Sequence, residues 1–217
     1  MLKNNSKVTL VGILTVWLCT VVVWLAYRLF FKNSELIEEV VLKPLVFIVP
    51  VIWYLWQRNV LTTENLGFRK VATKNVVIWG GLFSLFLASE NIFFSLSRGV
   101  PLIANRFTFG VLGTNLIVST ATAVSEEILY RGFLMENIWK ITGNEVVANA
   151  ASTFLFMIGH VGVAIFGFGY RGWDLGHFLL LMFVVGFTQG FIYGRTRSIS
   201  ASVPAHAIWN FVSAILR

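Results

Sequence analysis

Long apolar runs alternate with short polar segments along most of the chain. A membrane-spanning helix takes about 20 predominantly apolar residues, and most of the runs approach that length. They cover approximately residues 8–31, 41–56, 76–96, 107–127, 146–166, 175–193 and 199–216. The pattern predicts an all-α, polytopic transmembrane helix bundle of about six to eight spans.

Residues 132–144 follow a different pattern from these runs. Phe133, Leu134 and Ile138 alternate there with the polar Glu136 and Lys140. Apolar and polar residues on opposite faces of one helix are typical of a helix lying in the membrane interface. We therefore expect an amphipathic or partly inserted helix in this segment.

The composition excludes a soluble globular protein. Of the 217 residues, 57% are hydrophobic and only 12% are charged, and the mean hydropathy is +0.77. A soluble domain has about 25% charged residues. The spans use most of the chain, so we expect one membrane domain over residues 1–217. The first run is too long for a signal-peptide core and has no cleavage site after it, so it is expected to be retained.

The net charge of +7 comes from Lys and Arg residues in the short segments between apolar runs. At such positions basic residues anchor helices against lipid headgroups. This favours membrane lipid over nucleic acid as a partner, and the distribution of positive charge favours a cytoplasmic N-terminus. The sequence leaves the oligomeric state unknown, and the single Cys19 excludes an internal disulfide.

Adjacent glutamates end the fourth apolar run. An ionisable group inside a span costs at least about 2.5 kcal/mol, which makes it a functional candidate. Glu127 and Arg131 are four residues apart and share a helix face, so they are expected to pair. Glu126 points about 100° away and shares its face with Tyr130, without that partner. An unpaired carboxylate in a low-dielectric site serves as a general base, although a solvated helix end is the alternative interpretation.

Two further pairs with the same spacing lie in apolar runs: Phe156 with His160, and His206 with Asn210. A lone histidine in such a helix is commonly a satisfied core residue, and that alternative stays open for each. However, two of the three histidines in the chain lie in these runs. A buried glutamate, two histidines and an asparagine form a set that helices can bring together in a polar intramembrane cavity.

A glutamate and a neutral histidine together hold and deprotonate a water molecule. A second histidine and an asparagine have N–H groups that stabilise the oxyanion formed when this water attacks a carbonyl. Ser125 lacks a Gly-x-Ser-x-Gly setting, which argues against a serine nucleophile. A zinc site is the alternative interpretation, since one Glu and two His are competent zinc ligands. However, the chain has no His-Glu-x-x-His segment.

These motifs resemble, in type and order, those of the CAAX protease and bacteriocin-processing family, the type II CAAX prenyl endopeptidase group. The similar patterns are Glu126-Glu127-x-x-x-Arg131, Phe156-x-x-x-His160, Phe183-x-x-Gly186-x-x-x-Gly190 with Tyr193-Gly194, and His206-x-x-x-Asn210. The resemblance covers roughly residues 110–215. It divides the chain into accessory N-terminal spans, residues 1–107, and catalytic core spans, residues 108–217.

The resemblance implies an intramembrane protease that needs no metal or other cofactor. In it, Glu126 and His160 activate the hydrolytic water, and His206 and Asn210 form the oxyanion site. Glu127 and Arg131 keep the first motif in shape.

Three more residues are possible parts of the cavity wall: Tyr130, Phe156 and Glu90. For Glu90, which lies in the third apolar run, pairing with Arg98 or with another helix is the preferred alternative.

The resemblance also implies a peptide or membrane-associated protein as substrate. The short chain is more similar to bacterial members, which predicts a multi-pass protein of a bacterial plasma membrane that processes a peptide such as a bacteriocin or leader peptide, or acts in self-immunity. A prenylated substrate is less expected. The alternatives are a non-catalytic scaffold or immunity protein, and a small transporter with a Glu and His proton relay, for which no inverted repeat is found.

Overall fold

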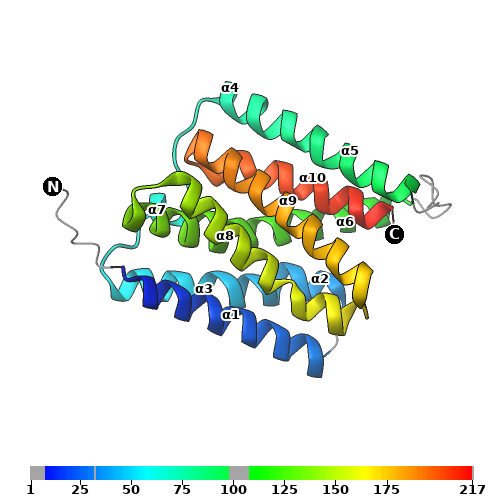
Figure 1. Ribbon diagram of the computed structural model, residues 1–217, viewed down its shortest axis with the longest axis horizontal. Helices are drawn as coiled ribbons and strands as arrows, with labels where there is room; N and C mark the ends of the chain where they lie inside the picture. Colours follow the sequence, from blue (N-terminus) through cyan, green and yellow to red (C-terminus); the bar gives the residue numbers. More distant parts are fainter. Residues whose placement is uncertain (1–7, 32, 98–107, 217) are drawn as a thin grey trace.

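The computed structural model describes residues 8–31, 33–97 and 108–216, and these contain helices and no strand (Figure 1). The long helices are α1 Leu10–Phe30, α3 Lys43–Gln57, α5 Gly81–Ser97, α6 Phe109–Glu127, α8 Glu145–Gly159, α9 Gly172–Thr196 and α10 Ile199–Ile215; the short ones are α2 Glu35–Ile37, α4 Thr73–Asn75 and α7 Glu136–Thr142. The prediction of an all-α bundle is confirmed.

The long helices lie side by side along the long axis of the molecule. Helices α1 and α3 pack together at one side, and α5 lies at the opposite side (Figure 1). Helix α10 runs between them and packs against α5, α6 and α9, while α8 packs against α9. The residues from α6 onward therefore form the centre of the bundle.

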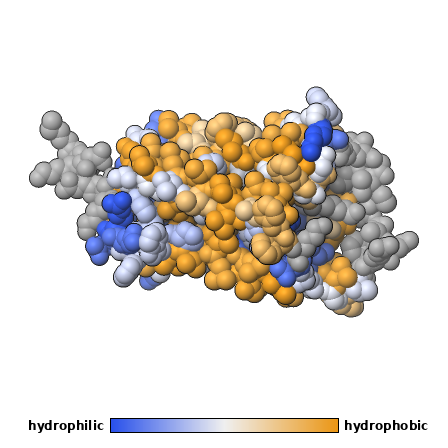
Figure 2. Space-filling model, turned by 90° about the horizontal axis from the view of Figure 1, so that it is seen from below, coloured by the Kyte–Doolittle hydropathy of each residue, from blue (hydrophilic) through white to orange (hydrophobic). Residues whose placement is uncertain are grey.

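Four helical stretches of the described residues are long and apolar enough to cross a bilayer. They are Leu10–Phe30, Thr73–Phe93, Glu145–Gly167 and Gly172–Thr196. Apolar residues cover the middle of the surface seen in Figure 2, and polar residues lie toward its two ends. These features are those of an integral membrane protein. A total of six to eight spans stays a prediction.

Side-chain caps explain where several helices begin. The Thr9 and Thr108 hydroxyls accept hydrogen bonds from backbone N–H groups in the first turns of α1 and α6. The Asn144 side chain does the same for α8, and that of Ser198 for α10. Such residues satisfy N–H groups that have no partner within the helix.

Residues 128–142 differ from the expected interfacial helix. The π-helical segment Ile128–Met135 joins α6 to α7, so the chain is helical without a break from Phe109 to Thr142. Every residue of the π-helical segment is buried. The polar Glu136 that follows it contacts Arg69 in the segment before α4 and Arg197 in the turn between α9 and α10, contacts that a sequence pattern does not reveal.

Glu136, fully buried at the start of α7, is the point at which these segments meet. Arg69 donates to its two carboxylate oxygens at 2.6 and 3.3 Å, and Arg197 does so at 2.9 Å. The Tyr193 hydroxyl donates at 2.8 Å, and Lys140 Nζ lies 3.3 Å away. The carboxylate thus ties three separate parts of the chain together.

Glu136 lies outside the four candidate spans. Burial alone would raise the pKa of its carboxyl, but the hydrogen bonds from Arg69 and Tyr193 and the nearby positive charges outweigh burial and lower the pKa to about 2. This stabilisation of the folded state is complete above the ordinary pKa of 4.5 and is lost as the pH falls toward 2.

Glycines allow α8 and α9 to approach closely. A Cβ atom at Gly186 would contact Thr153 and Phe156, and one at Gly190 would overlap the Asn149 side chain. Asn149 Nδ2 in turn donates to the Phe187 carbonyl at 3.1 Å. Small residues spaced four apart are typical of close helix packing in membranes.

We expect Gly190→Ala to lower the free energy of unfolding by about 1–3 kcal/mol, because the added methyl group displaces Asn149 from its hydrogen bond. Thermal unfolding in detergent measures the effect. Gly176→Ala is the matched control, since Gly176 lies on the same helix with open space around it. An equal loss of stability in both variants would contradict the packing role of Gly190.

We expect Glu136→Gln to destabilise the fold by about 3 kcal/mol, the lower end of the cost of breaking a buried ion pair, because its cations are partly exposed and regain water. Glu145→Gln removes a glutamate from a more exposed pair with Arg195 and is expected to cost less than about 1 kcal/mol. Unfolding by denaturant of both variants tests the difference, and equal losses would refute it.

Candidate active site

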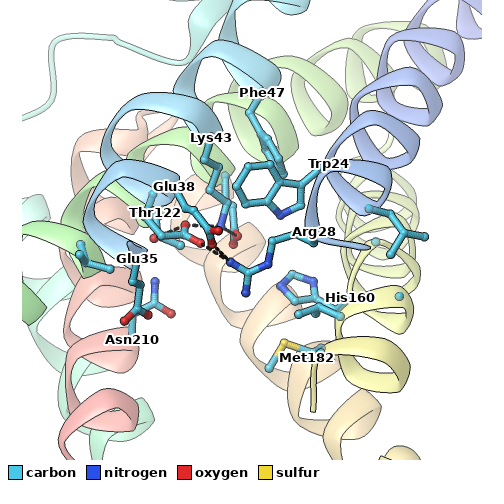
Figure 3. A pocket seen from close by; sticks show the side chains of 18 of the residues that line it. Trp24, Arg28, Glu35, Glu38, Lys43, Phe47, Thr122, His160, Met182 and Asn210 are labelled. Atoms are coloured by element: carbon cyan, nitrogen blue, oxygen red, sulfur yellow. Dashed lines mark hydrogen bonds and ion pairs between the residues drawn. The ribbon is translucent and has the colours of Figure 1, made fainter. Parts of the chain in front are cut away.

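A cavity of about 520 Å³ lies between α1, the start of α3, α6, α8, α9 and α10. Glu126, His160, His206 and Asn210 all contribute to its wall, although they come from three different helices. Figure 3 shows the His160 and Asn210 side chains at this cavity. The structure therefore brings together the four residues that the sequence motifs single out.

Glu127 and Arg131 lie behind this wall and are almost completely buried. The Glu127 carboxylate forms an ion pair with Arg131, with Nη1 and Oε1 2.9 Å apart, as expected for residues one helical turn apart. Arg131 also donates to the Gly186 carbonyl of α9 at 2.8 Å. The pair thus connects the end of α6 to the backbone of α9 at Gly186.

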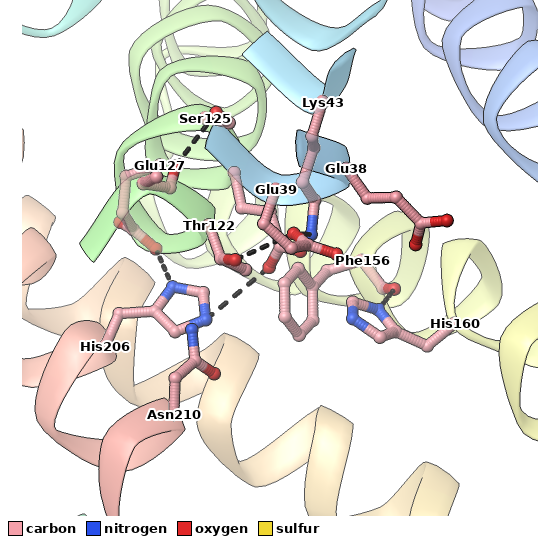
Figure 4. A network of polar contacts seen from close by, with 12 residues as sticks. Glu38, Glu39, Lys43, Thr122, Ser125, Glu127, Phe156, His160, His206 and Asn210 are labelled. Carbon is pink, nitrogen blue, oxygen red and sulfur yellow. Dashed lines mark hydrogen bonds and ion pairs between the residues drawn. The ribbon is translucent and has the colours of Figure 1, made fainter. Parts of the chain in front are cut away.

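His206 links the two glutamates. Its Nδ1 donates to Glu127 Oε1 at 2.9 Å, a contact visible in Figure 4. Its Nε2 lies 3.5 Å from Glu126 Oε2. Because a carboxylate accepts and does not donate, the Glu127 contact places a proton on Nδ1 and turns Nε2 toward the cavity.

Gln189 holds the backbone at His206 and was not identified from the sequence. With its amide oriented so that both groups have partners, its nitrogen donates to the Ser202 carbonyl and its oxygen accepts from the His206 N–H, each at 3.0 Å. In a regular helix these two backbone groups bond to each other. The fully buried Gln189 therefore inserts into α10 between the Ser202 carbonyl and the His206 N–H, on the turn that contains Pro204.

His160 ends α8 and is partly exposed. Its Nδ1 lies 2.8 Å from the Phe156 carbonyl. A carbonyl accepts only, so Nδ1 carries the proton and Nε2 of the neutral ring has a free lone pair. The ring also packs on Phe156, with centroids 4.4 Å apart. His160 thus has the orientation and the tautomer that a proton acceptor needs.

Asn210 lies on α10 one turn after His206, and its Nδ2 donates to the Ser119 carbonyl of α6 at 3.5 Å. Tyr130 and Phe156 also line the cavity, and their rings make an edge contact at 5.0 Å. These three side chains lie where the sequence analysis expects them.

Glu90 is not among the residues that line the cavity. It lies on α5, whose next residue, Asn91, donates to the Trp209 carbonyl of α10 at 3.3 Å. The alternative partner Arg98 lies outside the described residues. The position of Glu90 agrees with contact to another helix rather than with a place in the wall.

The expectation that Glu126 has no partner is wrong. Lys43 Nζ lies 2.7 Å from Glu126 Oε1 and 2.8 Å from Glu39 Oε2. The Thr122 hydroxyl donates to the same oxygen of Glu39 at 2.7 Å. The partner comes from a segment more than 80 residues earlier in the chain, a distance over which helix periodicity carries no information.

Arg28 and Glu38 form a second ion pair in the wall of the cavity (Figure 3). Glu38 also accepts from the backbone N–H of Asn33 at 3.0 Å. Arg28 and Glu38 were not singled out from the sequence. The only available signal was the spacing of four between Glu39 and Lys43, which predicts a pair on one helix face.

The described residues contain no group of three or more His, Cys, Asp and Glu side chains placed to hold a metal ion. Near Glu126 the ammonium group of Lys43 occupies one carboxylate oxygen. The residues present therefore do not fit the zinc site that their composition allows.

Comparison with known proteins agrees with this geometry. The family model for the type II CAAX prenyl endopeptidase Rce1-like proteins matches residues 108–212, slightly less than half of the chain. The match supports a relationship of this region to the CAAX protease family. No curated protein and no solved structure matches the chain.

The matched region contains all four wall residues singled out above, together with Glu127, Arg131 and Gln189. That family consists of CAAX-type intramembrane proteases, which act on peptides or proteins. The four long apolar helices, together with this match, indicate that the chain is an integral membrane protein. Lys43 and Glu39 lie outside the matched region.

We expect Gln189→Leu to lower the free energy of unfolding by about 1–3 kcal/mol, because it removes the partners of a buried N–H and a buried carbonyl in α10. Thermal unfolding in detergent checks this. Gln57→Leu, at an exposed position, is the control and is expected to have little effect. Unchanged stability of the Gln189 variant would show that α10 restores its own hydrogen bond.

Proposed function

We propose that this protein is an intramembrane endopeptidase in which Glu126 and His160 activate the hydrolytic water. The observation that carries the proposal is the placement of Glu126, His160, His206 and Asn210 in the wall of one cavity inside the matched region. A single cavity with both proton acceptors and hydrogen-bond donors is what hydrolysis without a covalent intermediate requires.

The steps follow from the bonds that each group already makes. Glu126 Oε1 is held by Lys43, so the other carboxylate oxygen and His160 Nε2 are the groups left to bind a water and accept its proton. The hydroxide oxygen forms a bond to the peptide carbonyl carbon, and the carbonyl oxygen becomes an oxyanion. The C–N bond then breaks as the accepted proton is returned to the leaving amine.

We assign the stabilisation of the oxyanion to the Asn210 amide N–H and to His206 in its doubly protonated form, in which Nε2–H donates while Nδ1–H stays bonded to Glu127. Both lie on one face of α10, and both are held by α6, through Ser119 and Glu127. Donors that are already oriented stabilise a developing charge without reorganisation in the transition state. Glu127 and Arg131 act by holding His206 and do not contact the substrate.

A peptide or membrane-associated protein is the proposed substrate, cleaved within a bacterial plasma membrane by a protein of six to eight spans. No metal takes part in the proposed mechanism. A zinc-dependent version with the same residues, and a non-catalytic scaffold or self-immunity protein, are outcomes that the following experiment distinguishes.

The test is cleavage of a quenched peptide library by purified protein in detergent. We expect the wild type to cleave, and Glu126→Gln and His160→Ala to lower kcat/KM by about 10²–10⁴-fold, because each removes a proton acceptor. Glu145→Gln changes a partly exposed glutamate that does not line the cavity, and this variant is expected to keep wild-type activity. A chelator is expected to have no effect.

Two results would contradict this mechanism in different ways. Loss of activity with chelator and its return with zinc would make the protein a metalloprotease. Absence of cleavage by a folded wild type, with both variants still supporting the cellular role, would favour the scaffold.

A further inference from the structure

Lys43 is the only lysine or arginine of the described residues that pairs directly with Glu126. It lies at the first position of α3, and its side chain is 5% exposed. It belongs to the N-terminal part of the chain, before the region that the family model matches. A cation from outside that region therefore contacts the carboxylate to which we assign the base.

We propose that Lys43 is a positioning residue of the active site, which holds one oxygen of Glu126 so that the other faces the water. The proposal rests on the proposed function of Glu126. It makes α3 part of the catalytic machinery, rather than an accessory span beside it.

The contacts of Lys43 are suited to this role. A lysine ammonium has three N–H donors, and two of its neighbours are the carboxylates of Glu126 and Glu39, at 2.7 and 2.8 Å. Glu39 is itself held by Thr122 of α6, the helix that ends with Glu126. The ammonium is therefore fixed with respect to the helix that carries the base, and not only to its own.

Aromatic rings restrict the side chain further. The Nζ atom lies 5.6 Å from the centroid of Trp24 on α1 and 5.5 Å from that of Phe47 on α3. Contacts of this kind are favourable for a cation and are stronger when water is excluded. Lys43 thus has a defined position between α1, α3 and α6, and Figure 4 shows its contact with Glu39.

Stability alone gives a weak reason for this arrangement. Burying ions costs several kcal/mol each, and apolar replacements of a complete buried ion group are commonly neutral or stabilising. Removing only the ammonium is different, since Glu39 and Glu126 would remain as two buried carboxylates with less compensation. A double variant that also neutralises Glu39 therefore separates the role in activity from the role in folding.

The test measures kcat and KM of the wild type, Lys43→Met and the double variant Glu39→Gln with Lys43→Met, after thermal unfolding shows which are folded. We expect kcat of the folded variants to fall about 100-fold, as for a misplacement of about 1 Å in a catalytic group, and KM to change little. Lys140→Met is the matched control. Lys140 also pairs with a buried glutamate four residues before it, but far from the cavity.

A second measurement tests whether the ammonium group of Lys43 itself is needed for activity. In Lys43→Ala, added ethylammonium is expected to restore activity several-fold, because the open cavity admits it beside Glu126. Tetramethylammonium, which has the charge but no N–H donor, is expected to restore nothing. A purely structural role of Lys43 would give no difference between the two salts.

The other outcomes overturn the proposal in distinguishable ways. Wild-type kcat in the folded double variant would refute the role of Lys43 and leave the proposed function intact. A higher kcat in the variants would make Lys43 a restraint on Glu126 instead. Absence of cleavage by the wild type would overturn the proposed function and this role with it.

Discussion

The buried carboxylate of Glu127 is the interaction on which the site depends. It forms an ion pair with Arg131 on its own helix and accepts a hydrogen bond from His206 on α10, both at 2.9 Å, and it is completely buried. A charge in that position is tolerated only when it is paired and hydrogen-bonded. Folding must therefore bring α6 and α10 together in one register, and the same register places Glu126, the neighbouring residue, beside the other nitrogen of His206.

The polar groups continue from this centre as one connected network. From Glu127 it passes through His206 and Glu126 to Lys43 and Glu39, with each contact between 2.7 and 3.5 Å. In a medium of low dielectric constant such a network is favourable when its members are satisfied and costly when one is removed. Accordingly, the residue types on the inner face of each helix are determined by their partners in the network. Lipid-facing positions, by contrast, tolerate many different apolar residues.

Interactions within one turn of helix were predictable from the sequence, and those between distant segments were not. The Glu127–Arg131 pair and the shared faces of His160 and His206 with their neighbours follow from a spacing of four residues. The all-α class followed equally directly from the length of the apolar runs. By contrast, the partners of Glu136, the insertion of Gln189 into α10 and the contact of Lys43 with Glu126 depend on packing between helices, which leaves no periodic signal.

The same distinction explains why the N-terminal spans looked accessory. Their family resemblance is weak, because a span that faces lipid needs only to be apolar, and α1 satisfies this with many exposed apolar side chains. Nevertheless, Arg28 of α1, Glu38 of the π-helical segment Glu38–Leu42 and Lys43 at the start of α3 all lie in the cavity wall. Charged residues from outside the matched region thus form part of the wall of this cavity.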